Sequence, residues 1–405
     1  ADLARPDKLA ACAKHFAGYG ATEAGRDYNT TDIPEIELRN VHLPPFRAAV
    51  EAGVTTFMAG FSDLNGVPCT GNTFLLDQVL RKEWGFDGFV VSDWESVAQL
   101  AMHGFTADDK DSAERAFNAG VDMEMASTTY LNHLAELLEE GKVSDEQIDR
   151  VVGRILELKF RLGLFERWQT SPAEFPALAA PESLTVAHEA ARQSIVLLKN
   201  DAGLLPLDAG STGSVAVIGP LADAPDEQLG TWVFDGDPDL SVTPLNALRK
   251  LANDAFEVHV ARGVATTRST STDGFAAAID AGKRADVALL FIGEEAILSG
   301  EAHCRADINL PGNQADLVDA VAATGTPVVL IIMAGRPLAL ENVVDKAAAI
   351  LYAWHPGTMA GPAITDLLFG VESPSGKLPV TLPRVTGQIP IYYAQKNTGR
   401  PGIPD

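Results

Sequence analysis

Residues 84–94, with the sequence WGFDGFVVSDW, contain the clearest pattern of secondary structure in the chain. A helical pattern over 74–84 stops at Gly85, and an apolar run at 89–92 follows and leads into Asp93. Glycine is common directly after a helix because it accepts the left-handed backbone conformation found there. A short apolar run without alternation is typical of a strand that is buried on both faces. The stretch therefore predicts a helix, a buried strand and a carboxylate at the carboxyl end of that strand.

The same alternation of strand and helix extends on both sides of this stretch. Further apolar runs of strand length lie at 9–16, 55–61 and 121–125. Helical patterns lie at 36–52, 112–119, 131–140 and 147–162. Such a succession predicts a parallel sheet covered by helices. Because a closed barrel needs eight strands and four are visible, this region is either a small open sheet or part of a barrel whose other half is missing.

A second alternating region follows a break in the pattern. The Pro- and Ala-rich stretch at 165–181 predicts an interdomain linker, and the segment 184–198 predicts a helix. Strands are then expected at 215–218, 257–260, 287–292, 328–332 and 348–352, and helices at 245–251, 275–281, 314–323 and 360–369. This order predicts a doubly wound α/β domain of about five strands, followed by a loop-like tail.

The charge balance excludes some partners. The 405-residue chain has 55 acidic and 31 basic side chains and a formal net charge of −24. Such a surface would repel a phosphate backbone or an anionic membrane, so we expect neither nucleic acid nor a membrane as a partner. The longest apolar runs are also far shorter than the ~20 residues of a bilayer span.

The three cysteines lie too far apart in sequence for a zinc knuckle or a disulfide framework. We expect Cys12, Cys69 and Cys304 to be buried thiols. They do not fix the compartment, so secreted, periplasmic and cytoplasmic locations all stay open.

Four common catalytic motifs are absent from the sequence. No GxGxxG follows a predicted strand, and Gly376-Lys377 is followed by Leu378 rather than by the Ser or Thr of a phosphate-binding loop. The segment 188–192 (HEAAR) lacks the second histidine of a zinc protease helix, and no GxSxG is present. The sequence therefore does not indicate nicotinamide, ATP, zinc-protease or serine-hydrolase chemistry.

Carboxylates remain as candidate reactive groups. Asp93 follows a buried strand and precedes Trp94, a setting that suits a nucleophile or base, and the alternative is that Asp93 caps the next helix. Glu301 lies in the glycine-punctuated loop 293–301 that leaves the strand at 287–292. Loops at strand ends often carry function, but three glutamates in this loop fit a solvated acidic surface equally well.

A cation and a histidine lie at another predicted strand end, where Lys14 is followed by His15. Parallel α/β folds build their sites at the carboxyl ends of strands. Contact with a ligand is therefore one interpretation of this pair, and participation in a buried salt bridge is the other.

Seven short motifs, spread over essentially the whole chain, resemble those of a known family. They are KHFAGYG (14–20), GRDYN (25–29), LNGVP (64–68), WGFDGFVVSDW (84–94), SIVLLKN (194–200), SGE (299–301) and LPGNQ (310–314). In this order they resemble glycoside hydrolase family 3 of the β-glucosidase type.

The resemblance implies an α/β fold in which the C-terminal half of a (β/α)8-like barrel precedes a doubly wound α/β sandwich domain. The implied domains are a partial barrel at 1–164 with the nucleophile, a linker at 165–183, a sandwich domain at 184–385 with the acid/base, and a tail at 386–405. The N-terminal half of the barrel is expected in the intact protein, and a fibronectin-like domain often follows in the family.

The resemblance also implies roles for individual residues, carried over by motif. The nucleophile would be Asp93 and the general acid/base Glu301. Groups that contact the sugar at the nonreducing end would be Lys14, His15 and Arg26. The pocket wall would include Met58 and Phe61, with Trp94 beside the nucleophile. Many relatives carry Tyr where Phe61 stands, so a hydroxyl is absent here.

The implied activity is that of a retaining, exo-acting β-glucosidase, which hydrolyses terminal β-D-glucosyl residues through a covalent glycosyl-enzyme and uses no metal or organic cofactor. Its substrates would be β-glucosides or short β-gluco-oligosaccharides. An N-acetylglucosaminidase of the family usually has an Asp-His dyad after the Lys-His strand, and here the next histidine is His42. A β-xylosidase or arabinofuranosidase, a non-catalytic carbohydrate-binding fragment, and a homodimer all stay open.

Overall fold

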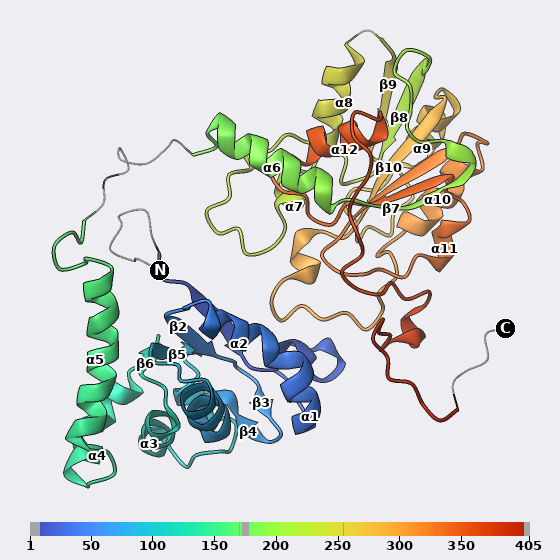
Figure 1. Ribbon diagram of the computed structural model, residues 1–405. Coiled ribbons are helices and arrows are strands. Elements are labelled where there is room, and N and C mark those ends of the chain that lie inside the picture. Colours follow the sequence, from blue (N-terminus) through green and yellow to red (C-terminus); the bar gives the residue numbers. More distant parts are fainter. Residues whose placement is uncertain (1–8, 170, 172–177, 254, 401–405) are drawn as a thin grey trace. The chain divides into compact units, whose positions relative to one another are not determined.

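The structure is a computed structural model that describes residues 9–169, 171, 178–253 and 255–400 of the chain. It divides into two compact units, Ala1–Phe175 and Pro176–Asp405 (Figure 1). Among the described residues, no helix combines the length and the apolar character that a membrane span requires. Each unit has its own sheet and its own core, and each is described separately below.

The first unit contains a parallel sheet with the strand order β1-β2-β5-β6. Its strands are β1 (Cys12–Phe16), β2 (Thr56–Ala59), β5 (Phe89–Trp94) and β6 (Met123–Met125). A short antiparallel hairpin, β3 (Asp63–Leu64) and β4 (Val67–Pro68), follows β2. All four predicted strands are therefore present, although β1, β2 and β6 are shorter than the apolar runs that predicted them.

Helices pack around this sheet (Figure 1). The longer ones are α2 (Pro44–Glu51), η5 (Phe74–Glu83), α3 (Asp109–Ala119), α4 (Thr129–Glu139) and α5 (Asp145–Arg161). The short ones are η1 (Tyr19–Ala21), η2 (Glu23–Gly25), α1 (Glu35–Glu37), η3 (Leu38–His42), η4 (Cys69–Gly71) and η6 (Ala98–Leu100). The single helix predicted over 36–52 is wrong, because Pro44 begins a new helix there and fixes its first turn.

An aromatic cluster holds β1 and β2 to the helices. The ring of Phe16, at the end of β1, is fully buried and packs edge-to-face against Phe46, Phe57 and Trp84 at centroid distances of 5.1, 5.3 and 5.9 Å. Aromatic pairs in this geometry add to the free energy gained by burial. The cluster therefore fixes the carboxyl end of β1 relative to β2 and to helices α2 and η5.

The second unit contains a six-stranded sheet with the order β7-β12-β11-β10-β8-β9. Its strands are β7 (Val196–Asn200), β8 (Ser214–Ile218), β9 (Glu257–Ala261), β10 (Val287–Gly293), β11 (Val328–Met333) and β12 (Ala349–Tyr352). Strands β8 to β12 are parallel, and β7 pairs antiparallel with β12. The chain runs from β8 to β9 on one side and then returns to β10 on the other side, so the strand order reverses between β8 and β10.

Helices cover both faces of this sheet (Figure 1). Apolar residues of α6 (Pro181–Ser194), α8 (Pro244–Ala252) and α12 (Ala360–Leu368) share one core with alternate strand residues. The opposite core contains α9 (Phe275–Lys283), α10 (Gln314–Ala322) and α11 (Glu341–Val344). The shorter segments are α7 (Pro225–Leu229), η8 (Asp201–Gly203), η9 (Pro238–Leu240), η10 (Ala296–Ser299) and η11 (Thr386–Gln388). The predicted doubly wound arrangement is thus present.

Two details of the second unit differ from the sequence predictions. The helix predicted over 184–198 ends at Ser194, and the following residues form β7. The sheet therefore has six strands rather than about five. The cause is tertiary, because Val196 and Leu197 pair with β12 instead of extending the helical turn.

The predicted linker and tail fall partly on residues that the structure does not describe, namely 170, 172–177 and 401–405. The prediction of three buried thiols is correct for Cys69 alone, since Cys12 and Cys304 are exposed. Burial raises the pKa of the Cys69 thiol to about 11.

Candidate active site

Asp93 lies near the carboxyl end of β5 and is only 6% exposed. Its Oδ1 accepts a hydrogen bond of 2.8 Å from the backbone N–H of Trp94. The preceding Ser92 is fully buried, and its hydroxyl accepts a hydrogen bond of 2.9 Å from the backbone N–H of Met125 on β6. These contacts fix both the strand end and the carboxylate that it carries. The interpretation of Asp93 as a helix cap is wrong, because η6 begins only after Val97.

His15 on β1 lies next to this carboxylate. Its Nε2 is 3.5 Å from Oδ2 of Asp93, and its ring packs edge-to-face against Tyr19 at 5.2 Å. The Tyr19 hydroxyl in turn donates a hydrogen bond to Asp27. The end of β1, the turn that follows it and the segment around Asp27 therefore form one connected polar group beside β5.

The other predicted site residues of the first unit lie at two levels of burial. Met58 is 8% exposed on β2 and pairs in register with Val91 of β5. The half-buried Phe61 ring meets Tyr28 edge-to-face at 5.2 Å. The exposed residues are Lys14, Arg26 and Trp94. The structure thus brings His15 to Asp93, whereas contacts of Lys14 and Arg26 with a sugar stay predictions.

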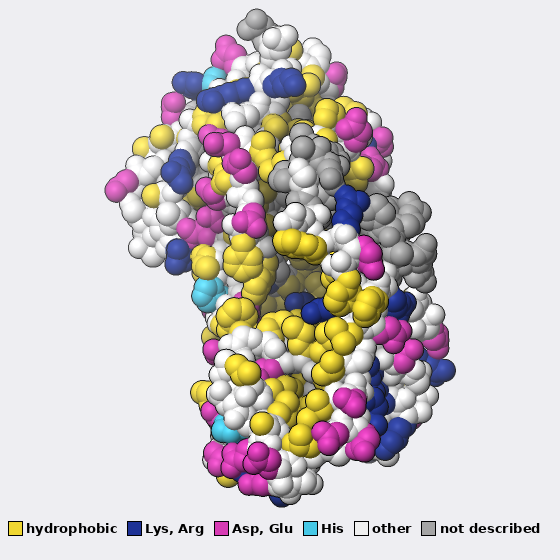
Figure 2. Space-filling view, turned by 90° about the vertical axis from the view of Figure 1, so that its left-hand side faces the viewer, with side chains coloured by type: hydrophobic (Ala, Val, Ile, Leu, Met, Phe, Trp, Pro, Cys, Tyr) yellow, Lys and Arg dark blue, Asp and Glu magenta, His cyan; other side chains and the backbone are white. Residues whose placement is uncertain are grey.

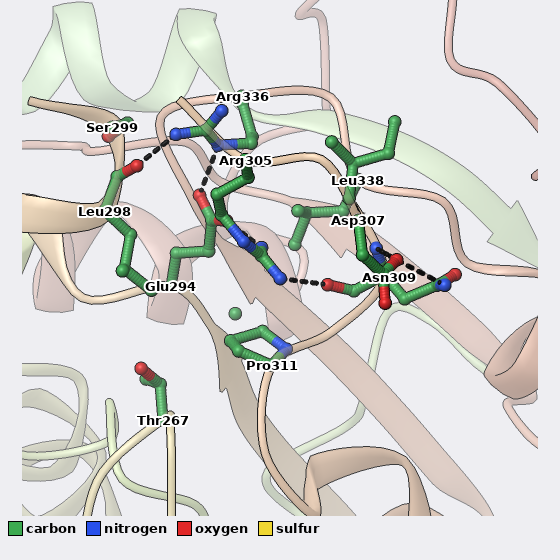
Figure 3. Close-up of polar contacts among 12 residues, drawn as sticks. Thr267, Glu294, Leu298, Ser299, Arg305, Asp307, Asn309, Pro311, Arg336 and Leu338 are labelled. Carbon is green, nitrogen blue, oxygen red and sulfur yellow. Dashed lines mark hydrogen bonds and ion pairs between the residues drawn. The ribbon is translucent and has the colours of Figure 1, made fainter. Parts of the chain in front are cut away.

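In the second unit, a loop after β10 contains three glutamates, of which Glu294 and Glu295 pair with arginines. Glu294 is fully buried, and its two carboxylate oxygens accept hydrogen bonds from Arg305 and Arg336 (Figure 3). Glu295 accepts hydrogen bonds of 2.7 Å from Arg268 and 2.8 Å from Thr267. Burial raises the pKa of Glu295, but the hydrogen bonds from Arg268 and Thr267 outweigh burial, so its pKa lies below the usual value.

Two of the three glutamates in this loop have arginine partners that the structure describes. Glu295 pairs with Arg268, which favours its ionised carboxylate and works against a role as proton donor, and both carboxylate oxygens of Glu294 accept hydrogen bonds from arginines. Glu301 follows η10 in the same loop. The interpretation of this loop as a solvated acidic surface is therefore wrong for Glu294, and Glu301 stays the candidate acid/base.

Two close approaches support the start of the loop. Gly293 has φ +142°, and a side chain there would collide with the backbone of Met333 on β11. A side chain at Gly335 would likewise collide with Ser299. Both positions require glycine because the loop is packed directly against the neighbouring strand end.

The loop also contacts α7 and a half-buried histidine. Glu227 accepts a hydrogen bond of 2.5 Å from the backbone N–H of Ala296, and burial raises the pKa of its carboxyl. The His355 ring lies 3.4 Å from the Ser299 hydroxyl, and burial lowers the pKa of the imidazole. Of the described residues, no three His, Cys, Asp or Glu side chains are grouped to hold a metal ion.

Sequence reasoning missed the Tyr19–Asp27 pair and the arginine partners of Glu294. The sequence does indicate Glu294 as a candidate, because it directly follows a buried strand. Asp93 has a similar position near the end of β5. The partners of Glu294, however, lie 11 and 42 residues further along the chain, and only the fold brings them together.

Family models match both parts of the chain. Residues 4–158 match the glycosyl hydrolase family 3 N-terminal domain, and residues 195–402 match the glycosyl hydrolase family 3 C-terminal domain. The chain therefore belongs to glycosyl hydrolase family 3, as the sequence motifs predict.

Individual relatives agree with this assignment. A periplasmic β-glucosidase of Salmonella typhimurium is 40% identical over 97% of this chain and 54% of its own length. A β-xylosidase of Formosa agariphila is 38% identical over 95% of this chain and 55% of its own. The solved structure of a β-glucosidase from Listeria innocua in complex with glucose is 38% identical, with a TM-score of 0.94, over 100% of this chain and 55% of that chain. The chain thus spans about half the length of the curated relatives it matches.

Proposed function

We propose that this chain is the catalytic part of a retaining, exo-acting β-glucosidase that hydrolyses terminal, non-reducing β-D-glucosyl residues. The observation that carries the proposal is the nearly buried Asp93 carboxylate, which the Trp94 N–H orients and His15 flanks at a strand end. The likeness to β-glucosidases, including one solved with laminaribiose, supports β-glucosides or short β-gluco-oligosaccharides as substrates.

In the proposed reaction, Asp93 attacks the anomeric carbon and forms a covalent glycosyl-enzyme. Glu301 first protonates the leaving oxygen and then deprotonates the water that releases the sugar. Retention of configuration requires the two carboxyl groups at about 5–5.5 Å from each other in the working enzyme. Direct contacts with the sugar are assigned to Lys14, His15 and Arg26, and the pocket wall to Met58, Phe61 and Trp94.

For the fold, we propose that residues 1–164 are the second half of a (β/α)8-like barrel and residues 184–385 the sandwich domain, joined by the linker 165–183 and followed by the tail 386–405. Two observations support the half-barrel. The sheet of the first unit has strand edges at β1 and β6, and apolar side chains such as Met123, Val152 and Phe160 are exposed on this unit. Figure 2 shows apolar side chains gathered on one of its faces. The relatives, at about twice the length of this chain, leave room for the first half.

A β-xylosidase is the second candidate, because the Formosa agariphila enzyme is nearly as similar to this chain as the β-glucosidase is. Glucose differs from xylose by the C6 hydroxymethyl group, so the two activities separate on one substituent. An N-acetylglucosaminidase and a non-catalytic carbohydrate-binding role are the further alternatives, and one experiment tests all four.

The experiment uses the full-length protein and p-nitrophenyl β-glucoside, β-xyloside and β-N-acetylglucosaminide. We expect the highest kcat/KM on the glucoside, and Asp93→Asn should lower kcat by at least about a thousand-fold because the nucleophile is lost. A 2-deoxy-2-fluoro-glucosyl fluoride should leave a covalent label on Asp93, found by peptide mass mapping. A label on another residue, or binding of glucose without turnover, would overturn the proposal. A preference for the xyloside would instead support the second candidate, a β-xylosidase.

A further inference from the structure

Glu294 lies between two arginines at the carboxyl end of β10. The Glu294 side chain is fully buried, whereas those of Arg305 and Arg336 are 17% and 19% exposed. Nε of Arg336 donates a hydrogen bond of 3.0 Å to Oε2 of Glu294, and Nη1 of Arg305 donates to Oε1 (Figure 3). A buried carboxylate is stable only when it is paired, and two guanidinium groups supply that pairing here. We call these three residues the Glu294 clamp.

Arg336 also binds the backbone of the loop that contains Glu301. Its Nη2 donates to the carbonyl of Leu298 and, over 3.1 Å, to the carbonyl of His303. These carbonyls lie three residues before and two residues after Glu301. One guanidinium group therefore spans the turn from both sides and ties it to the buried carboxylate.

The two arginines of the clamp are themselves held by further hydrogen bonds. The fully buried Tyr352 on β12 donates a hydrogen bond of 2.5 Å to the carbonyl of Arg336 and accepts one of 3.1 Å from the N–H of Leu338. Arg305 donates a hydrogen bond of 3.0 Å to the carbonyl of Asn309. Tyr352 of β12 thus fixes the backbone of Arg336, and Arg305 ties the clamp to the backbone at Asn309.

We propose that the Glu294 clamp positions Glu301, with Arg336 as the residue that transmits the position. This inference rests on the proposed function, in which Glu301 is the acid/base. Proton transfer requires the donor within hydrogen-bond reach of the leaving oxygen, and a misplacement of about 1 Å can cost on the order of a hundred-fold in rate. The clamp restrains the backbone on both sides of Glu301.

The dependence of rate on the leaving group separates positioning from general damage to the fold. Poor leaving groups such as a second glucose need proton donation, whereas 2,4-dinitrophenolate leaves without it. In the full-length enzyme, Arg336→Lys keeps a positive charge for Glu294 but cannot span two carbonyls and a carboxylate. We expect kcat/KM for laminaribiose to fall about 10- to 100-fold, and kcat/KM for 2,4-dinitrophenyl β-glucoside to stay within about two-fold.

Arg268→Lys is the matched control, because it makes the same chemical change in an arginine that pairs with Glu295 of the same loop. It should leave the ratio of the two rates unchanged. If Arg336→Lys does not fold, the same two kcat/KM values are measured for Glu294→Gln, which keeps the shape of the side chain and removes its charge. Equal loss on both substrates, or no loss, in the variant that folds would overturn the inference.

Glu301→Gln distinguishes this failure from a failure of the proposed function. If Glu301→Gln shows the loss that is selective for poor leaving groups and the clamp variant does not, only the positioning role is wrong. If Glu301→Gln itself lacks the selective loss, Glu301 is not the acid/base, and the proposed mechanism and the positioning role are both wrong.

Discussion

Each unit of this molecule contains a buried carboxylate held by two arginines, but at opposite ends of a strand. In the first unit, Asp122 precedes β6 and accepts hydrogen bonds of 2.5 Å from Arg81 and 2.7 Å from Arg154. In the second unit, Glu294 follows β10 and pairs with Arg305 and Arg336. Both carboxylates are almost or fully inaccessible to solvent.

The two clusters differ in the backbone that their arginines hold. Arg81 donates to the carbonyls of Phe86 and Gly88, in the turn before β5, whereas Arg336 donates to the loop that carries Glu301. In parallel α/β folds the amino ends of strands serve stability and the carboxyl ends carry function. Two ion clusters of the same chemistry therefore lie at opposite strand ends, and on this rule we expect Asp122 to serve stability and Glu294 to serve the proposed active site.

We expect the largest effect on stability from Asp122→Ala, which removes the buried carboxylate of the first unit. This change leaves Arg81 and Arg154 without their shared carboxylate and removes the hydrogen bond of 2.7 Å to the N–H of Val90. We expect the free energy of unfolding to fall by about 3–5 kcal/mol, as is usual when one partner of a buried ion pair is removed. Chemical denaturation measures this loss.

The ratio of rates on laminaribiose and 2,4-dinitrophenyl β-glucoside should stay constant in the folded fraction of Asp122→Ala. A change in that ratio would contradict the division of roles between the two clusters. Asp87→Ala is the matched control, because Asp87 is an exposed carboxylate near Arg81 and its loss should change stability by less than about 0.5 kcal/mol.

We expect a decrease in pH to have an intermediate effect on folding stability, because His355 of the second unit becomes protonated. Burial lowers the pKa of this imidazole, and a hydrogen bond with the backbone of Glu227 and the nearby Glu294 oppose the shift only in part. The folded state therefore binds fewer protons than the unfolded state below the usual His value of about 6.5. Stability should be fully present above that pH and should decline as the pH falls toward the lower, folded pKa.

Thermal melts between pH 8 and pH 5 measure this decline. His355→Gln should reduce its slope, because the variant has no imidazole to protonate. The exposed His103 provides the control, and His103→Gln should leave the slope unchanged. An identical slope in wild type and His355→Gln would show that other groups cause the acid sensitivity.

We expect the smallest effect on stability from an exposed cluster in which, as around Asp122, arginine and carboxylate side chains are hydrogen-bonded. Arg39 forms two hydrogen bonds of 2.8 and 3.0 Å with Glu83 and one of 2.8 Å with Glu35, at the surface of the first unit. Water and salt screen such pairs. Arg39→Gln should lower the free energy of unfolding by less than about 1 kcal/mol in urea titrations, and a loss as large as that of Asp122→Ala would remove burial as the explanation.

Much of the fold was predictable because strand and helix patterns are local. The run 89–92 gave a buried strand with Asp93 at its end, and the order of strands in the second unit gave its doubly wound sheet. The segment 194–200 was not predictable, because its residues suit either a helix or a strand and β12 decides between them. Similarly, the sequence places Glu294, Glu295 and Glu301 in one loop, but the arginines that pair with Glu294 and Glu295 come from other segments that only the fold brings near.

The pairing of β7 with β12 has a consequence for synthesis of the chain. The first strand of the second unit, β7, pairs with β12, the last strand of its sheet to be synthesised. Helix α6 likewise packs against α12, which is synthesised later still. A ribosome that stalls before Ala349 would release a product in which β7 lacks its partner and the apolar edge of β11 is open. Such truncated chains should aggregate rather than persist as a smaller soluble domain.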